Sequence, residues 1–172
     1  DLDARYIGNA VKALKKPGDV VIVEAQHKAL RDHYVKQVLS QLMAVYANIL
    51  VKRCKKDRDW MIAAINQAFV KNKVSGQSGT SNDITEVWIL ELNSSEDFGM
   101  LKLAQTLVSQ FEEAGTCVLV SCSSSITSQS EFVKWSNRAE IPFWHFEAPD
   151  SSAIDAFWSA RRKWVLLIRR EG

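Results

Sequence analysis

Carboxylates follow or end two of the apolar segments in this sequence. Glu24 comes directly after residues 20–23, and Glu91 lies near the end of residues 87–92. Paired carboxylates can transfer protons in general acid–base catalysis or bind Mg²⁺. If the two segments are adjacent strands, Glu24 and Glu91 face each other and form, with the serine-rich turn 121–125, the site of a small α/β enzyme. The simpler interpretation is two solvated acids at strand ends.

Cysteine and histidine offer less chemistry. The three cysteines are Cys54, Cys117 and Cys122, an odd number, and two of them sit in apolar runs. This usage indicates reduced thiols rather than disulfides. Cys122, among serines, is the best placed to act as a nucleophile, although we expect a buried thiol there. Cys117 and Cys122 are five residues apart on one expected strand and so should lie on opposite faces. His27 and His33 lack the i, i+4 spacing of two ligands on one helix face.

Two groups of basic residues are hidden by the formal net charge of +2. The first comprises Lys52, Arg53, Lys55, Lys56 and Arg58. The second comprises Arg161, Arg162, Lys163, Arg169 and Arg170, with Trp164 among them. Such clusters can follow nucleic-acid phosphates or an anionic lipid surface, and they also suit an acidic protein partner. The simpler interpretation is a solvated face with tryptophans in the core.

Hydrophobic periodicity predicts alternating helices and strands. Helices are predicted over residues 2–16, 29–46, 57–69, 96–114, 128–138 and 150–162. Strands are predicted over residues 19–23, 48–51, 87–92, 116–120 and 141–146, with Pro142 favouring an edge position for the last. Alternation of this kind predicts an α/β fold with three layers, α/β/α, around a mainly parallel sheet of five strands.

The length of 172 residues predicts one domain spanning 1–172. Residues 72–83 are polar and rich in Gly and Ser, which predicts a flexible loop, and residues 164–172 are a candidate docking tail. No apolar run approaches the length of a membrane span, and no signal peptide is visible, so a cytoplasmic location is expected. Because the chain begins with Asp1, we expect a fragment or processed chain, whose missing regions could attach it to a membrane.

A resemblance to a known family rests on three segments. ALKKPGDVVIVEAQHKALRDHYVKQVL is interpreted as helix, turn, strand, loop and helix, and the strands VWILEL and TCVLVSCSS follow. Over residues 3–162 this pattern resembles the AAA-type ATPases of bacterial secretion and cell-envelope systems, which implies a P-loop NTPase-like fold; a Rossmann-like fold shares the pattern. The resemblance puts the phosphate loop at Glu24, Gln26, His27 and Lys28, the Walker B motif at Glu91 and Asn93, and the sensor at Ser121 or Ser123.

The departures from that family concern its chemistry. A phosphate loop has the pattern G-x-x-x-x-G-K-[ST], but residues 24–31 contain no glycine, and Glu24 adds a negative charge. The Walker B position lacks an acidic pair, because Glu91 is followed by Leu92 and Asn93. We therefore expect no ATP hydrolysis, no bound cofactor and no metal. The helical lid of the family is missing or lies outside this chain.

The resemblance then implies a pseudo-ATPase that acts as a protein-interaction or regulatory module in a larger assembly, with an envelope, secretion or membrane-associated assembly as the candidate. Three alternatives stay open. A receiver-like domain has the same βα units but would be degenerate too, with Glu24, Glu91 or Asn93, and Ser121 or Ser123 at its site positions. The others are a nucleic-acid-binding accessory domain and the small enzyme described above. Neither the partner nor the oligomeric state follows from the sequence.

Overall fold

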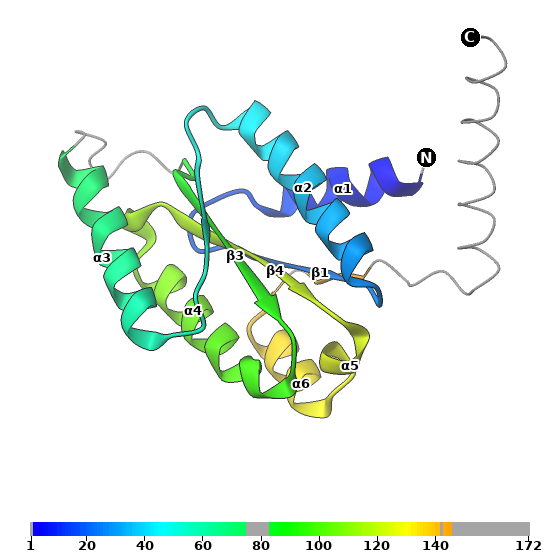
Figure 1. Cartoon of the computed structure of the whole chain (residues 1–172). Helices are drawn as coiled ribbons and strands as arrows, with labels where there is room; N and C mark the ends of the chain where they lie inside the picture. The colour runs from blue at the N-terminus through cyan, green and yellow to red at the C-terminus, as the bar shows by residue number, and fades with distance from the viewer. Residues whose placement is uncertain (1, 75–82, 142, 146–172) are drawn as a thin grey trace, which may run out of the picture.

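The computed structural model describes residues 2–74, 83–141 and 143–145, which alternate between strands and helices (Figure 1). The strands are β1 (Val20–Glu24), β2 (Leu50–Arg53), β3 (Glu86–Leu92), β4 (Thr116–Cys122) and β5 (Phe143–His145). The α-helices are α1 (Leu2–Ala13), α2 (Lys28–Val45), α3 (Arg58–Val74), α4 (Phe98–Gln110), α5 (Ser124–Thr127) and α6 (Ser130–Arg138). Two short 3₁₀ turns, η1 (Ser95–Asp97) and η2 (Glu112–Ala114), flank α4.

The strands form a parallel sheet in the order β2-β3-β4-β1-β5. Strand β4 is central, since it pairs with β3 on one side and with β1 on the other. Its register sets Ser121 beside Glu91 of β3 and Cys122 beside Glu24 of β1. The carboxyl ends of β1, β4 and β3 therefore meet at one edge of the sheet.

Helices cover both faces of this sheet, as Figure 1 shows, and each face has its own apolar core. On one face α1 and α2 pack over residues such as Val21, Val23 and Leu119. On the other, α3, α4 and α6 pack over residues such as Ile22 and Trp88. Alternate residues of a strand point to opposite faces, so the uninterrupted apolar runs of β1 and β4 supply both cores.

The predicted α/β class, with a parallel sheet and helices on both faces, is confirmed by this arrangement. The expected position of the last strand is also confirmed, because β5 pairs only with β1 among the described strands. Cys117 and Cys122 belong to different cores and so lie on opposite faces, as their spacing predicts. Of the helices in the described part of the chain, none combines the length and apolar character that crossing a bilayer requires.

The order of the strands contradicts two of the folds that the alternating pattern allows. Receiver and flavodoxin domains have the order 2-1-3-4-5, and classic Rossmann sheets have 3-2-1-4-5-6. Here β1 lies between β4 and β5, and β2 does not touch it. The receiver-like and Rossmann-like interpretations are therefore wrong in topology, because local periodicity identifies strands and does not say which strands are neighbours.

Strand β2 differs most from its prediction as a buried strand over 48–51. It begins at Leu50, after Asn48 turns the chain with a φ of 66°, and it lies at the edge of the sheet. Leu50 and Arg53 are exposed. Its apolar residues predicted a strand buried on both faces. Instead it is an edge strand that pairs only with β3 among the described strands.

Helix α3 is longer than predicted, so the polar segment 72–83 begins within it. The helix continues to Val74. In its last turn the Asn72 amide donates to Thr85 Oγ1 at 3.3 Å and to the Glu113 carbonyl at 3.1 Å. Residues 75–82 lie outside the described part of the chain. The predicted flexible loop is thus wrong at its start.

Other boundaries moved by a few residues. Helix α1 ends at Ala13, and the predicted helix 96–114 is divided into η1, α4 and η2. The serine-rich turn includes a short helix, α5, ahead of α6. The predicted helix 150–162, the docking tail 164–172 and the second basic group all lie outside the described residues.

Candidate functional site

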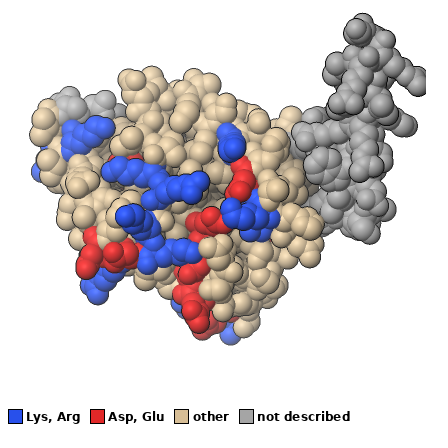
Figure 2. All heavy atoms as spheres, in the orientation of Figure 1, with Lys and Arg blue, Asp and Glu red and all other residues tan. Residues whose placement is uncertain are grey.

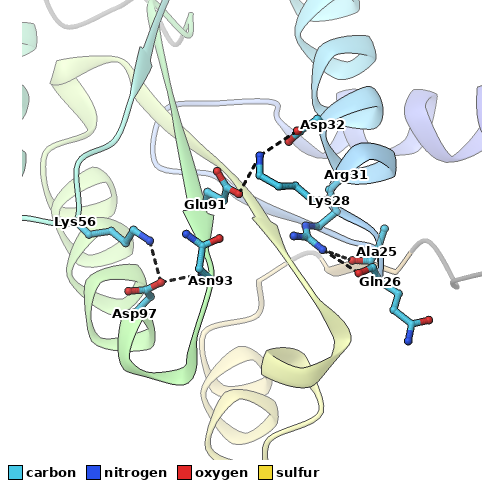
Figure 3. Close-up of polar contacts among 9 residues, drawn as sticks. All are labelled: Ala25, Gln26, Lys28, Arg31, Asp32, Lys56, Glu91, Asn93 and Asp97. Carbon is cyan, nitrogen blue, oxygen red and sulfur yellow. Dashed lines mark hydrogen bonds and ion pairs between the residues drawn. The ribbon is translucent and has the colours of Figure 1, made fainter.

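The candidate site is the edge of the sheet where β1, β4 and β3 end, beneath the start of α2 (Figure 3). In open α/β sheets ligands bind outside the carboxyl ends of the strands, which makes this the place to look for chemistry. The phosphate-loop, Walker B and sensor positions of the sequence interpretation all lie here, on three neighbouring strands.

The connection from β1 to α2 is short and closed by a buried arginine. Only Ala25, Gln26 and His27 separate the strand from the helix. Arg31, which is 7% exposed, reaches back from α2, and its Nη1 donates to the carbonyl oxygens of Ala25 at 2.7 Å and Gln26 at 3.3 Å (Figure 3). A phosphate loop turns backbone N–H groups toward its anion. This loop turns two carbonyl oxygens toward a cation instead.

Sequence reasoning missed Arg31. Its position could have been found, because it shares a helical stripe with the buried residues Tyr34, Val35, Val38 and Leu42. An arginine on an apolar stripe is rarely buried without partners. The loop carbonyls are those partners, and they could not be identified before the strand and helix were placed.

The remaining phosphate-loop positions do not converge on a ligand. Gln26 and His27 are exposed, and His27 occupies the N-cap position of α2 without a capping hydrogen bond from its side chain. Lys28 Nζ lies 3.2 Å from Asp32 Oδ2 and 3.5 Å from Glu91 Oε1. The hydrogen bond to Asp32 and the charge of Glu91 raise the pKa of Lys28.

The Walker B position continues this chain of charges. In the orientation that satisfies both ends of its amide, Asn93 donates to Glu91 Oε1 at 3.2 Å and accepts from Lys56 Nζ at 3.2 Å. Lys56 Nζ is also 2.9 Å from Asp97 Oδ2. Figure 3 shows Lys28 bonded to Asp32 and Glu91, and Asp97 bonded to Lys56 and Asn93. With the Asn93 amide in this orientation, the two groups form one network across the edge.

Asp97 is the most firmly held acid of this network. Its Oδ2 accepts from the backbone N–H groups of Asn93 at 2.9 Å and Ser94 at 3.3 Å. Burial acts to raise the pKa of Asp97, but the hydrogen bonds from Lys56 and from these N–H groups outweigh it, and the net pKa lies below the ordinary value. A charged Asp97 thus fixes the turn that follows β3.

Glu24 and Glu91 do not face each other. Strand β4 lies between β1 and β3, and strand alternation puts Glu24 on the face of Ile22 and Glu91 on the opposite face with Ile89. Glu24 is 2% exposed, whereas Glu91 is bound to Lys28. The paired-carboxylate alternative is therefore wrong, and the enzyme alternative loses its acid–base pair. The simpler interpretation of two solvated acids is also wrong for Glu24, which is buried.

The serine-rich turn supplies no nucleophile that the structure supports. Ser121 is buried, and its Oγ has no hydrogen-bond partner among the described residues. Ser123 Oγ lies 2.6 Å from Ser125 Oγ at the surface. Cys122 is buried, and burial raises its pKa to about 12. A thiol with such a pKa stays protonated at neutral pH and is a poor nucleophile.

The first basic group is divided by its ion pairs. Lys52 Nζ lies 3.2 Å from Glu86 Oε1, a buried carboxylate that also accepts from the indole of Trp88, and Lys56 belongs to the network above. Arg53, Lys55 and Arg58 are exposed. Figure 2 shows several basic side chains on this face of the molecule, with acidic side chains among them.

The residues at this edge do not fit a nucleotide or its magnesium ion. The loop directs carbonyl oxygens inward, and both the lysine and the acid that such a ligand needs are bound to protein groups. Within the described ranges, no group of three or more His, Cys, Asp and Glu side chains is placed to hold a metal ion.

Comparison with known proteins finds similarity to solved structures only. No family model matches the chain, and no curated protein matches it. The solved structure of Rhizobiales Trip13 is similar over 83% of this chain, with 10% sequence identity and a TM-score of 0.46. The match covers 50% of the other chain, so this chain spans about half of its length.

Proposed function

We propose that the chain is a P-loop-like α/β domain that does not hydrolyse nucleotides and acts as a protein-interaction or regulatory module of a larger assembly. The P-loop-like part of the proposal is supported by the order of the strands, in which β1, β4 and β3 lie side by side. A P-loop domain needs its phosphate loop, Walker B and sensor positions on adjacent strands, and the corresponding residues here stand on adjacent strands.

The contact of Arg31 with the β1–α2 loop is the observation that carries the loss of catalysis. Its guanidinium, 2.7 Å from the Ala25 carbonyl, occupies the inner side of the loop, where a phosphate would need N–H donors. Lys28, the one residue of the loop position able to meet a phosphate as a point charge, is held by Asp32 and Glu91. Lys28 and the Nη1 of Arg31, the cations closest to the loop position in the chain, are thus paired with groups of the domain itself.

Calorimetric titration with ATP, ADP and GTP in the presence of Mg²⁺ tests this proposal. We expect no saturable heat and no release of phosphate. The same titration of an Arg31→Met variant is a matched test. Removing the guanidinium does not supply the backbone N–H groups that a phosphate needs, so the variant should not bind nucleotide either. Micromolar affinity of the native chain for any of these nucleotides, or turnover, would refute the proposal.

A role as a nucleic-acid accessory domain is less well supported by the described residues. Lys52 and Lys56 are bound to acids of the domain, which leaves Arg53, Lys55 and Arg58 as exposed cations of the first group. A salt-dependent gel shift with single- and double-stranded DNA and RNA separates this alternative from the proposal. A shift whose salt slope corresponds to several phosphate contacts would favour the alternative.

A further inference from the structure

Strand β2 presents an open backbone edge. Its ladder to β3 uses alternate residues, since Leu50 N–H donates to the Thr85 carbonyl at 3.0 Å and Cys54 N–H to the Ile89 carbonyl at 2.8 Å. In a parallel ladder the residues between them direct both N–H and C=O to the other side. The backbone groups of Val51 and Arg53 therefore point away from the sheet, and among the described strands only β3 pairs with β2.

The side chains along this edge are apolar at its start and basic beyond it. Leu50 is 38% exposed and Val51 is half-buried. Arg53, Lys55 and Arg58 follow as exposed cations, and Figure 2 shows basic side chains on the face crossed by β2 in Figure 1. Two exposed acids, Asp57 and Asp59, flank Arg58 at the start of α3, and Asp57 Oδ1 accepts the N–H of Asp59 at 3.2 Å.

We propose that the β2 edge binds an extended acidic peptide segment of a partner protein by strand addition. The outward N–H and C=O groups of Val51 and Arg53 would pair with its backbone, and its carboxylates would lie against Arg53, Lys55 and Arg58. Main-chain bonds supply affinity in this mode of recognition and alternate side chains supply specificity. This proposal rests on the interaction role proposed above and names the surface that performs it.

Two other occupants fit the edge less well. A second copy of the chain would bring its own Arg53 and Lys55 against the same residues, and like charges at an edge oppose such pairing. A nucleic acid offers phosphates to the cations but has no alternating donors and acceptors that match Val51 and Arg53. An acidic peptide satisfies both the backbone groups and the charges.

Selection from a displayed library of random ten-residue peptides against the whole 172-residue chain tests the proposal. The enriched peptides should combine acidic residues with β-branched or aromatic ones. Val51→Pro removes the outward N–H and leaves the ladder to β3 intact, since residue 51 does not donate to it. It should weaken binding of an enriched peptide about tenfold, as expected for one or two lost hydrogen bonds.

The matched control is Val51→Thr, which keeps the N–H and should bind as the native chain does. The Arg53→Glu, Lys55→Glu double variant should lose the preference for acidic peptides. Circular dichroism checks that each variant is folded. If Val51→Pro does not fold, the test uses the native chain and an enriched peptide that is methylated at alternate backbone nitrogens. This methylated peptide should no longer bind.

Four outcomes overturn the proposal: no acidic enrichment, equal binding by Val51→Pro and Val51→Thr, self-association that Val51→Pro abolishes, or an oligonucleotide that competes for the edge. Because Val51 is remote in the fold from the β1–α2 loop, the nucleotide titration is independent of these results. Failure at the edge therefore leaves the proposed loss of catalysis standing, and nucleotide binding would not by itself remove the edge site.

Discussion

Lys28 Nζ, at the start of α2, lies 3.5 Å from Glu91 Oε1, near the end of β3, and so joins two elements that both border the carboxyl edge of the sheet. The Lys28 side chain is 63% exposed and that of Glu91 is 33% exposed. Surface pairs of this kind are weak and are screened by salt. The pair nevertheless joins the lysine and the acid that the sequence interpretation assigns to the phosphate-loop and Walker B positions, so each has the other as a partner.

A double-mutant cycle with Lys28→Gln and Glu91→Gln should give a small stabilising coupling at low salt. The coupling should disappear at high salt, because the pair is accessible to counterions. Urea unfolding of the four proteins at the two salt concentrations measures it. A coupling that persists at high salt would show that the pair is shielded from solvent and would contradict this account.

Replacing Arg31 by Met should lower the free energy of unfolding by about 1–3 kcal/mol, because the Ala25 and Gln26 carbonyls lose a charged donor in a buried place. Lys36→Met, a substitution of an exposed cation on the same helix, should change stability by less than about 0.5 kcal/mol. Chemical denaturation measures both. Equal effects of the two substitutions would refute the structural role of Arg31.

Acid should weaken the fold partly through Asp97. Because its pKa is lower in the folded chain, the unfolded chain binds the proton more readily, and the stabilisation is complete above the unfolded pKa of about 3.9. It is lost as the pH falls through the folded pKa. Lys56→Met should flatten this part of the stability profile, and Lys134→Met, an exposed lysine of α6, should leave it unchanged. Urea unfolding across the acid range gives the three profiles.

Gly115 should resist substitution. It has a φ of 70°, and a Cβ there would lie 2.8 Å from Asn72 Nδ2 and closer still to Thr85 Oγ1. Gly115→Ala should therefore cost at least about 1–2 kcal/mol from the backbone conformation alone. Gly8→Ala, in open space within α1, should instead stabilise the helix by up to about 1 kcal/mol. Thermal unfolding distinguishes these opposite signs.

The three thiols should be inert in the folded chain. Burial raises the pKa of Cys54 and of Cys122 to about 12, and it raises that of Cys117 further. Alkylation by iodoacetamide at mildly alkaline pH, read by mass spectrometry, should label none of them until urea is added. Rapid labelling of native Cys122 would contradict its burial and reopen it as a nucleophile.

The sequence by itself determined the order and kind of most elements. The apolar runs of β1 and β4 are long enough to show that both faces are covered, and the alternation with amphipathic helices leads to a parallel sheet. The absence of glycines and of a Lys-Ser/Thr pair after β1 is likewise visible in the sequence. These features are local, so periodicity and motif spacing report them directly.

Tertiary structure alone decided which strands are neighbours, and therefore which side chains meet at the candidate site. The insertion of β4 between β1 and β3 separates Glu24 from Glu91. The register, which sets Glu24 beside Cys122 but Glu91 beside Ser121, puts the two acids on opposite faces. The same order leaves β2 at an edge, and Arg31 finds its carbonyl partners only after α2 folds back on its loop. Contacts between distant segments depend on how whole elements pack, and no local pattern encodes them.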